Sequence, residues 1–215
     1  MKIKFGIIVL TILVFTLASC ETSKNDTFDY GKIENNIYSN DYFNFNMKLP
    51  EGWSILSKEA MKESADRGAD LISGDNEELK SVLNASKVKT AYLLNAFKYE
   101  VGKSVDYNPG FIVVSENLKF FTGIKTGADY YYHVKKLLEK SKLNFNVEEN
   151  ITTVNIGGES FDKMCLSINH LNLNVKQEYY TTIKEGFALG FIISFVNNSQ
   201  RDELLEIINS LEFKS

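Results

Sequence analysis

The sequence has 215 residues, of which 44% are hydrophobic, 24% charged and 13% aromatic. One globular domain suits this composition, and the low content of proline (two) and glycine (thirteen) excludes a collagen-like or long disordered chain. The formal net charge is −4. Nucleic acid and anionic lipid are bound through clusters of Lys and Arg, so neither is expected as the main partner.

The N-terminus has the parts of a secretory signal peptide. Lys2 and Lys4 form a short basic region, and residues 5–17 are almost entirely apolar. An apolar core of roughly 13 residues is too short to span a bilayer and is typical of the hydrophobic region of a signal peptide. Removal of this segment lowers the net charge from −4 to −6.

The four residues Leu17-Ala18-Ser19-Cys20 follow the apolar core. An aliphatic residue, two small residues and a cysteine resemble a bacterial lipobox, in which the cysteine thiol accepts a diacylglyceryl group after cleavage. We therefore predict cleavage before Cys20 and lipidation of Cys20, because two or more acyl chains give stable membrane anchoring. The alternative is an ordinary secretory signal in which Cys20 stands by chance.

The anchored protein is expected outside the cytoplasm, on the cell membrane. It would lie on the outer face of the plasma membrane in a one-membrane cell, which the abundance of Asn, Lys and Ile favours by indicating an A+T-rich genome. Glu21 instead resembles the signal for transfer to the outer membrane of a two-membrane cell. The sequence leaves both envelopes open.

Three segments follow from this pattern. Residues 1–19 are the predicted signal peptide, residues 20–40 a flexible tether with lipidated Cys20, and residues 41–215 one globular domain. The tether is assigned because residues 21–40 are polar and lack periodicity. A flexible chain of about 20 residues has a root-mean-square reach of roughly 25 Å.

The first half of the domain is predicted to contain strands and helices. Apolar and polar residues alternate over residues 42–49, which indicates a strand with Phe43, Phe45, Met47 and Leu49 on its buried face. Ser57 is a predicted helix N-cap, and Thr126 with Asp129 resembles a capping box. The expected elements are strands over 42–49, 88–100 and 111–115, and helices over 57–72, over 76–85 and from 127.

The last third is predicted to be an antiparallel meander followed by a helix. Gly157-Gly158 and Glu185-Gly186 are hairpin signals, and residues 187–195 read as a central core strand. Ser199 with Asp202 is expected to cap the last helix, which packs through Leu204, Leu205, Ile208 and Leu211. The fold class is therefore α+β, a single domain with an antiparallel β-sheet and helices packed on it.

The segment Tyr42-Phe43-Asn44-Phe45 and the later Leu49-Pro50-Glu51-Gly52-Trp53 resemble the opening of PsbP-like domains. This family includes the photosystem II extrinsic subunit P, a Ran-binding import factor and uncharacterised bacterial lipoproteins. The resemblance covers about residues 38–214 and implies an α/β/α sandwich that binds another protein and performs no catalysis. No metal-ligand cluster matching the photosystem subunit is present, so we expect no cofactor.

Catalytic chemistry has one formal candidate. Cys165 is the cysteine left after lipidation, and His133 and His170 are the two histidines. Cys165 and His170 lie five apart on one predicted strand, so they should point to opposite faces. We therefore interpret Cys165 as a small core residue and predict no catalytic, cofactor-binding or metal-binding residue.

Two tyrosine runs are candidate interface residues. Tyr130, Tyr131 and Tyr132 cannot all be buried on one helical face, so at least one ring is expected to be partly exposed. Tyr179 and Tyr180 are neighbours on a predicted strand, and the exposure of one of these rings is open for the same reason. Exposed tyrosines are frequent anchors in interfaces. The alternative places one ring in the core and the others flat on the surface.

Three functions remain open. The leading hypothesis is a non-catalytic, protein-binding or assembly module of the cell envelope, with an envelope protein of unknown identity as partner. The second is a small-ligand-binding lipoprotein, and the third is an enzyme that depends on Cys165.

Overall fold

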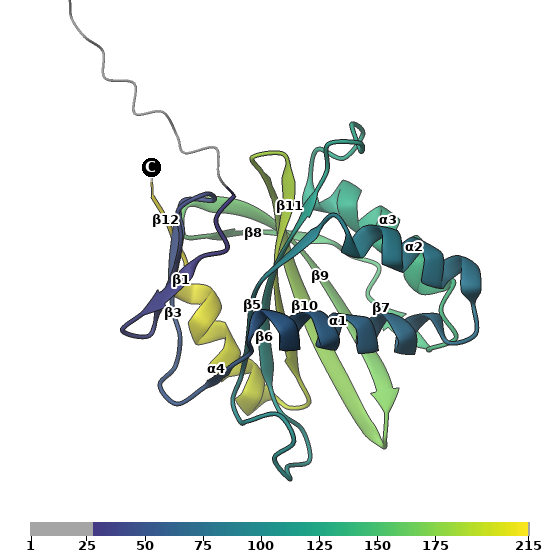
Figure 1. The fold of residues 1–215 in the computed structure, drawn as a ribbon, viewed down its shortest axis with the longest axis horizontal. Coiled ribbons are helices and arrows are strands. Elements are labelled where there is room, and N and C mark those ends of the chain that lie inside the picture. The colour runs from purple at the N-terminus through teal and green to yellow at the C-terminus, as the bar shows by residue number, and fades with distance from the viewer. Residues whose placement is uncertain (1–27, 215) are drawn as a thin grey trace, which may run out of the picture.

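The structure is a computed structural model that describes residues 28–214 (Figure 1). The predicted signal peptide and Cys20 lie outside this range. The described chain contains four helices and twelve strands, arranged as two antiparallel sheets in a single-domain α+β fold. The predicted fold class is confirmed, and the second, smaller sheet is an addition that the sequence did not indicate.

The small sheet has the strand order β1-β2-β3-β12. It joins the two ends of the described chain, because β12 near the C-terminus pairs with β3. Its strands are β1 (Lys32–Glu34), β2 (Ile37–Asn40), β3 (Phe45–Lys48) and β12 (Glu212–Phe213).

The predicted tether is wrong over its last part, because residues 32–40 form the β1–β2 hairpin. Tyr38 is buried and donates its hydroxyl to Tyr30 O at 2.9 Å, while Asn40 donates its amide to Asp29 O at 2.9 Å. The sequence pattern missed this hairpin because most β1 side chains are exposed and polar. Folded structure therefore begins by residue 28.

The large sheet has the order β4-β5-β6-β11-β10-β9-β7, and β8 also pairs with β9. As predicted, β11 is central and lies between β6 and β10. The predicted Gly157-Gly158 and Glu185-Gly186 turns connect β8 to β9 and β10 to β11. The strands are β4 (Ser54–Ile55), β5 (Thr90–Phe97), β6 (Gly110–Asn117), β7 (Phe145–Val147), β8 (Thr152–Ile156), β9 (Glu159–His170), β10 (Leu173–Lys184) and β11 (Phe187–Phe195).

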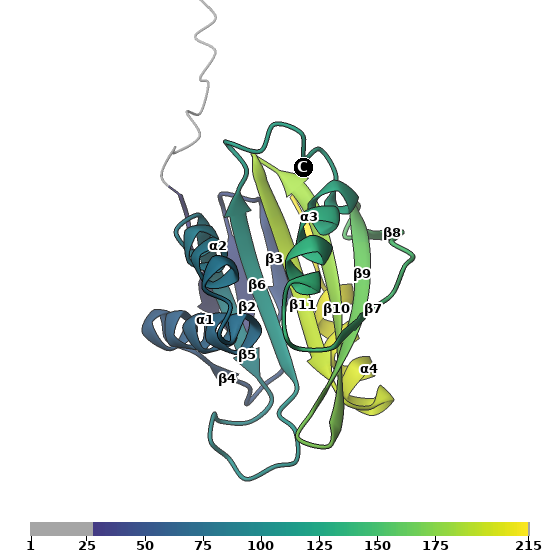
Figure 2. The same ribbon diagram turned by 90° about the vertical axis from the view of Figure 1, so that its right-hand side faces the viewer.

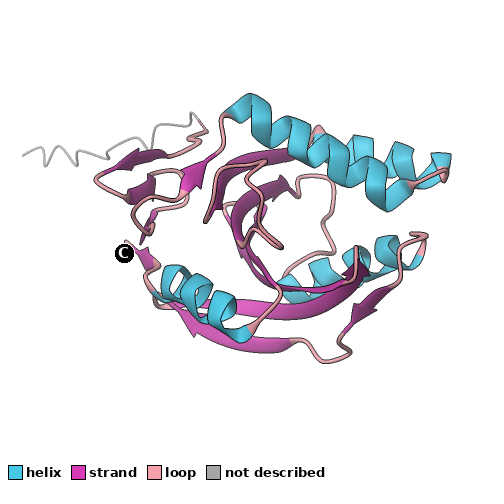
Figure 3. Ribbon diagram, turned by 90° about the horizontal axis from the view of Figure 1, so that it is seen from below, coloured by secondary structure: helices cyan, strands magenta, loops and turns pink. Residues whose placement is uncertain are grey.

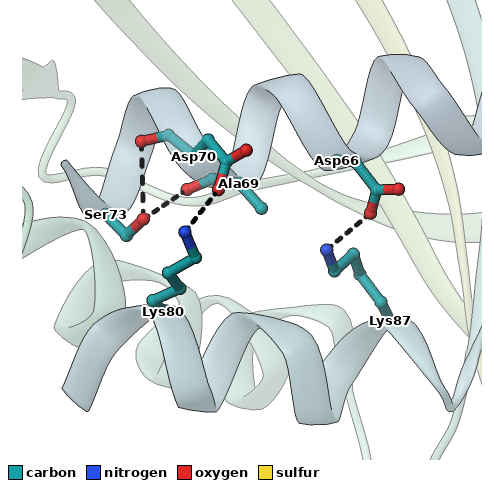
Figure 4. A network of polar contacts seen from close by, with 6 residues as sticks. All are labelled: Asp66, Ala69, Asp70, Ser73, Lys80 and Lys87. Atoms are coloured by element: carbon teal, nitrogen blue, oxygen red, sulfur yellow. Dashed lines mark hydrogen bonds and ion pairs between the residues drawn. The ribbon is translucent and has the colours of Figure 1, made fainter. Parts of the chain in front are cut away.

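Helices α1 (Lys58–Ser73) and α2 (Glu77–Lys87) run side by side and lie next to β5 (Figures 1 and 2). Ser57 caps α1 as predicted. Two ion pairs join the helices, Lys87 Nζ to Asp66 Oδ1 at 2.6 Å and Lys80 Nζ to Asp70 Oδ1 at 3.0 Å (Figure 4). Exposed pairs of this kind add little to stability, because water screens both charges.

Helix α3 (Gly127–Glu139) packs on β9 and β10, and its C-terminal end meets the α1–α2 turn, where Ser141 Oγ donates to Ile72 O at 2.6 Å. Helix α4 (Asn198–Asn209) packs on β11, apart from the α1–α2 pair (Figure 3). The predicted Thr126–Asp129 capping box is present at the start of α3. The predicted cap of α4 is wrong: Asn197, not Ser199, accepts a hydrogen bond from Gln200 N at 3.0 Å. The helix begins earlier because the Asn197 side chain reaches the free N–H groups of the first turn.

The main core lies between the large sheet, the small sheet and α4. The predicted face of the first strand is confirmed, since Phe43, Phe45, Met47 and Leu49 are all buried there. On α4, Leu204 and Ile208 are buried as predicted, with Ile207 beside them and Leu205 only partly buried. Leu211, just after the helix, is also buried as predicted. A second cluster under α3 covers the opposite face of the large sheet, where Tyr131 packs on Met164 and Leu166.

Candidate functional site

Four of the five candidate interface tyrosines are buried or partly buried. The hydroxyl of Tyr131 donates to Thr181 Oγ1 at 2.9 Å, and burial raises the pKa of this phenol. The hydroxyl of Tyr130 donates to Glu116 Oε2 at 2.7 Å, and that of Tyr179 to Gln177 Oε1 at 2.8 Å.

Tyr132 alone of the five is exposed, with 57% of its surface accessible. Its ring lies on α3 with Lys136 Nζ at 4.4 Å from the ring centroid and His133 at 5.6 Å. The expectation that at least one ring of the 130–132 run is exposed is therefore confirmed. Tyr131 and Tyr180 are buried, Tyr130 and Tyr179 are partly buried, and each donates its hydroxyl within the fold, so an interface role for these four stays a prediction.

Tyr180 belongs to a buried charged cluster on β9, β10 and α4. The Glu178 carboxylate, 8% exposed, accepts from Arg201 Nε at 2.6 Å, Tyr180 Oη at 2.5 Å and Lys163 Nζ at 3.0 Å. Burial acts to raise the pKa of Glu178, but the hydrogen bonds from Arg201, Tyr180 and Lys163 outweigh it and hold that pKa below its usual value. The cluster fastens the first turn of α4 to the sheet.

Cys165 lies directly opposite Glu178 in the β9–β10 ladder and is half-buried. Burial raises the pKa of its thiol, and the nearby carboxylates of Glu178 and Glu148 act in the same direction. A raised pKa disfavours the thiolate, which is the nucleophilic form of cysteine. His133 is exposed on α3, and His170 is the last residue of β9, five positions after Cys165. Cys165 therefore has the environment of a structural cysteine.

Metal binding finds no support within residues 28–214, because no group of three or more His, Cys, Asp or Glu side chains there is arranged to hold an ion. The same part of the chain contains no helix that is both long and apolar enough to cross a membrane.

One feature with the properties of a binding surface is the connection between β5 and β6, residues 98–109, which we call the β5–β6 loop. Its two ends are clamped together, since Tyr99 N donates to Asn108 Oδ1 at 3.0 Å and Asn108 Nδ2 donates back to Tyr99 O at 2.8 Å. Lys98 N also donates to Pro109 O at 3.1 Å. The loop reaches the lower end of the range, about 12–15 residues, above which connections are uncommon and often functional.

Side chains at the base of the loop fasten it to the rest of the domain. The hydroxyls of Tyr107 and Ser194 lie 2.5 Å apart, which connects the loop to β11. Lys98 Nζ donates to Glu203 Oε2 at 2.7 Å, which connects it to α4. Burial raises the pKa of Tyr107, so this phenol stays protonated. The base of the loop is thus held in place before any partner arrives.

Apolar side chains are exposed at the tip of the same loop. Val101 is 62% exposed and Val105 is 38% exposed. Between them and α1 lies an open hollow of about 310 Å³, which we call the loop hollow, lined among others by Arg67, Phe97 and Tyr107. Apolar groups beside a few polar ones suit the binding of a side chain from another molecule.

Sequence reasoning missed the β5–β6 loop as a site. The signal that could have indicated it is Val101 and Val105 standing in a stretch that otherwise has the Gly, Ser, Asp and Pro content of a turn. An apolar residue in such a stretch has no strand or helix to bury it. The tyrosine runs were predicted as interface residues because tyrosine is common in interfaces, but the exposure of each ring depends on packing.

No protein-family model matches the sequence, and no curated protein matches it either. Among solved structures, the cyanobacterial PsbP of Synechocystis sp. PCC 6803 matches with a TM-score of 0.51 and 11% identity over 83% of this chain and 91% of that one. A structure from Bacteroides thetaiotaomicron has a TM-score of 0.42 and 11% identity over 80% of this chain, which spans only 46% of that chain.

LpqN of Mycobacterium tuberculosis, described as involved in cell envelope biogenesis, has a TM-score of 0.41 and 12% identity over 80% of this chain and 83% of that one. At these identities only the fold is shared, and the cyanobacterial structure is the informative one. Its match covers nearly its whole length, so the likeness extends over the domain and not over one motif. The chain has a PsbP-like fold.

Proposed function

We propose that this chain is a lipid-anchored protein of the bacterial cell envelope whose folded domain binds another protein and catalyses no reaction. The observation that carries the binding role is the β5–β6 loop, in which exposed Val101 and Val105 stand on a backbone held by the Tyr99–Asn108 clamp. A surface ordered in advance loses less conformational entropy on binding, so more of the contact energy appears as affinity.

A protein fits this surface better than a small molecule does. The loop hollow of about 310 Å³ is open and stands at the lower limit of pockets that enclose a drug-sized ligand. It can hold one side chain of a partner while Val101, which is 62% exposed, is covered by the surrounding surface. A partner segment with an apolar anchor residue is complementary to this hollow, whose charged lining residues are Arg67, Lys103 and Asp106, with Arg67 Nη1 paired to Glu63 Oε2 at 3.7 Å.

The groups capable of covalent chemistry support a non-catalytic role. The raised pKa of Cys165 keeps its thiol protonated. Glu178 is engaged by three donors, and the Tyr130 and Tyr131 hydroxyls are committed to hydrogen bonds within the fold. These groups hold α3 and α4 on the sheet.

The envelope location rests on the N-terminal sequence. Lys2 and Lys4, the apolar core and the Leu17–Cys20 tetrapeptide together favour export and lipidation at Cys20. A Cys20→Ala variant is expected to incorporate no palmitate and to be released from the membrane fraction. Unchanged labelling of that variant would contradict the anchor.

The binding role is tested by site-specific photo-cross-linking in cells. A photoreactive phenylalanine analogue is placed at Val101, and the matched control carries it at Val82, an equally apolar residue on α2 that is 38% exposed. One envelope protein captured in near-stoichiometric amount from position 101, and not from position 82, supports the proposal. Cross-links that are absent at 101, or identical at both positions, contradict it, and the small-ligand hypothesis then becomes the better one.

A further inference from the structure

The end of the domain opposite the β5–β6 loop has a different surface. Strand β6 runs from Gly110 to Asn117, so its two ends are separated by roughly 25 Å. The β5–β6 loop precedes β6, and residues 118–126 follow it at the other end (Figures 1 and 2). At that second end Val88 is 89% exposed, Phe120 78% and Tyr30 44%. We call this surface the proximal patch; it consists of Phe28, Tyr30, Val88, Lys89, Lys119 and Phe120.

The exposure of Phe120 follows from how its loop is fixed. Leu118 and Ile124 on either side are buried and pack with Ala188. Leu118 N donates to Gly186 O at 2.9 Å, and Phe121 N donates to Leu118 O at 2.7 Å. Because both flanks are anchored in the core, the residues between them must point outward.

Lysines accompany the apolar groups of the patch. Lys119 Nζ lies 5.9 Å from the centroid of the Phe120 ring, and Lys58 Nζ lies 4.5 Å from that of Tyr30. Lys89 and Lys119 both line an open hollow of about 420 Å³ at this end, and its described lining includes no Asp or Glu. The described lining of this hollow thus carries two positive charges, although the net charge of the whole chain is −4.

The start of the described chain lies in the same place. The Phe28 ring contacts Phe187 and Tyr30, with centroid distances of 5.4 and 5.1 Å. Cys20 precedes Phe28 by eight residues, and a fully extended chain of that length spans at most about 29 Å. If the acyl chains on Cys20 are in a bilayer, Phe28 cannot be farther than this from the lipid headgroups, and Val88, Lys119 and Phe120 line the same hollow as Phe28.

We propose that the proximal patch rests on the surface of an anionic phospholipid membrane, with Val88 and Phe120 in the interface and Lys89 and Lys119 against the headgroups. Aromatic and aliphatic side chains gain free energy at the acyl boundary, while lysines are attracted to anionic lipids and extend their ammonium groups to the headgroup level. This inference rests on the proposed anchor. It goes beyond the anchor by fixing the orientation of the domain, with the β5–β6 loop facing away from the membrane.

The test uses the full-length lipoprotein purified from membranes and placed in vesicles of phosphatidylglycerol and phosphatidylcholine. An environment-sensitive fluorophore is attached in a Cys165→Ser background at either Thr122→Cys, beside Phe120, or Ser104→Cys, in the β5–β6 loop. Brominated lipids are expected to quench the label at 122 and to leave the label at 104 unquenched.

Tether length alone could bring position 122 nearer the membrane, so a second variant is decisive. Val88→Ser combined with Phe120→Ser is expected to abolish most of the quenching at 122, and Lys89→Gln with Lys119→Gln to reduce it in anionic vesicles. Val101→Ser, the matched change of an exposed valine at the other end, is expected to leave the quenching unchanged.

The outcomes separate the two proposals. A chain that neither floats with vesicles nor carries the mass of a diacylglyceryl group overturns the anchor. A chain that floats but shows no quenching at 122, or quenching unaffected by the Val88 and Phe120 substitutions, overturns the proximal patch alone.

Discussion

Replacement of Glu178 by leucine tests whether the buried cluster fastens α4 to the sheet. Leucine is close to glutamate in volume and removes the acceptor that Arg201 Nε, Tyr180 Oη and Lys163 Nζ share at 2.6, 2.5 and 3.0 Å. The Tyr180 hydroxyl is then buried without its acceptor. The two cations then face each other at side-chain exposures of 32% for Arg201 and 17% for Lys163.

The expected loss in the free energy of unfolding is about 3 kcal/mol. Breaking a buried ion pair costs about 3–5 kcal/mol, and the lower end applies because both cations can turn toward water. For a domain of this size, about 3 kcal/mol corresponds to a fall in Tm of roughly 6–12 °C. The control is Glu34→Leu, since the Glu34 carboxylate is 70% exposed in its pair with Lys32 and its loss should cost less than about 1 kcal/mol.

The pH dependence gives a second measurement on the same variant. The folded pKa of Glu178 lies below its usual value, so the carboxylate contributes stability above the unfolded pKa of about 4.3. That contribution is lost as the pH falls through the folded pKa. Urea unfolding of residues 21–215 should therefore show a large difference between native and Glu178→Leu chains at pH 7, and a smaller one in acid. Equal stabilities at pH 7, or a difference that does not change with pH, would refute the reasoning.

Three further predictions concern single positions. Gly157→Ala should strongly lower the free energy of unfolding, because φ at Gly157 is +59° and the new Cβ would lie 2.5 Å from Leu211 O. Gly158→Ala, at φ +88° with open space around the new Cβ, should lower it by only about 1–2 kcal/mol. Urea unfolding measures both variants. The Cys165 thiol should react with iodoacetamide much more slowly in the native chain at pH 7.5 than in urea, and similar rates would contradict its raised pKa. Tyr131→Phe should cost about 1–2 kcal/mol by leaving its buried partner without a donor, while Tyr132→Ala should change stability by less than about 0.5 kcal/mol; equal effects would contradict their assigned burial.

Local chemistry made several parts of the fold predictable. The alternation of Phe43, Phe45 and Met47 specified one buried face, and Ser57 and Thr126 marked helix starts because their side-chain oxygens satisfy N–H groups a few residues away. Gly157-Gly158 marked a hairpin, since both residues have positive φ. Each of these signals depends on neighbours within a few positions along the chain.

Interactions between distant segments explain what was missed. The β1–β2 hairpin is polar in sequence and folds because Tyr38 and Asn40 bond back to residues 29 and 30 and β3 pairs beside β2. The predicted N-cap of α4 was misplaced because Asn197, Ser199 and Asp202 are all residue types that favour the start of a helix. The exposure of the tyrosines could not be predicted, because the helical period alone does not show which face of the helix the sheet will cover.

The sequence by itself determined the α+β class, the order of most elements and the expectation of an exported, lipid-anchored chain, because residue periodicity, turn chemistry and the N-terminal pattern are local. Only the tertiary structure decided which groups stay available at the surface. It placed Tyr131 and Tyr180 in cores, left Val101 and Phe120 exposed at opposite ends, and brought Lys163, Glu178 and Arg201 together. Exposure is a property of what packs against a side chain, and those neighbours come from strands and helices far away in the sequence.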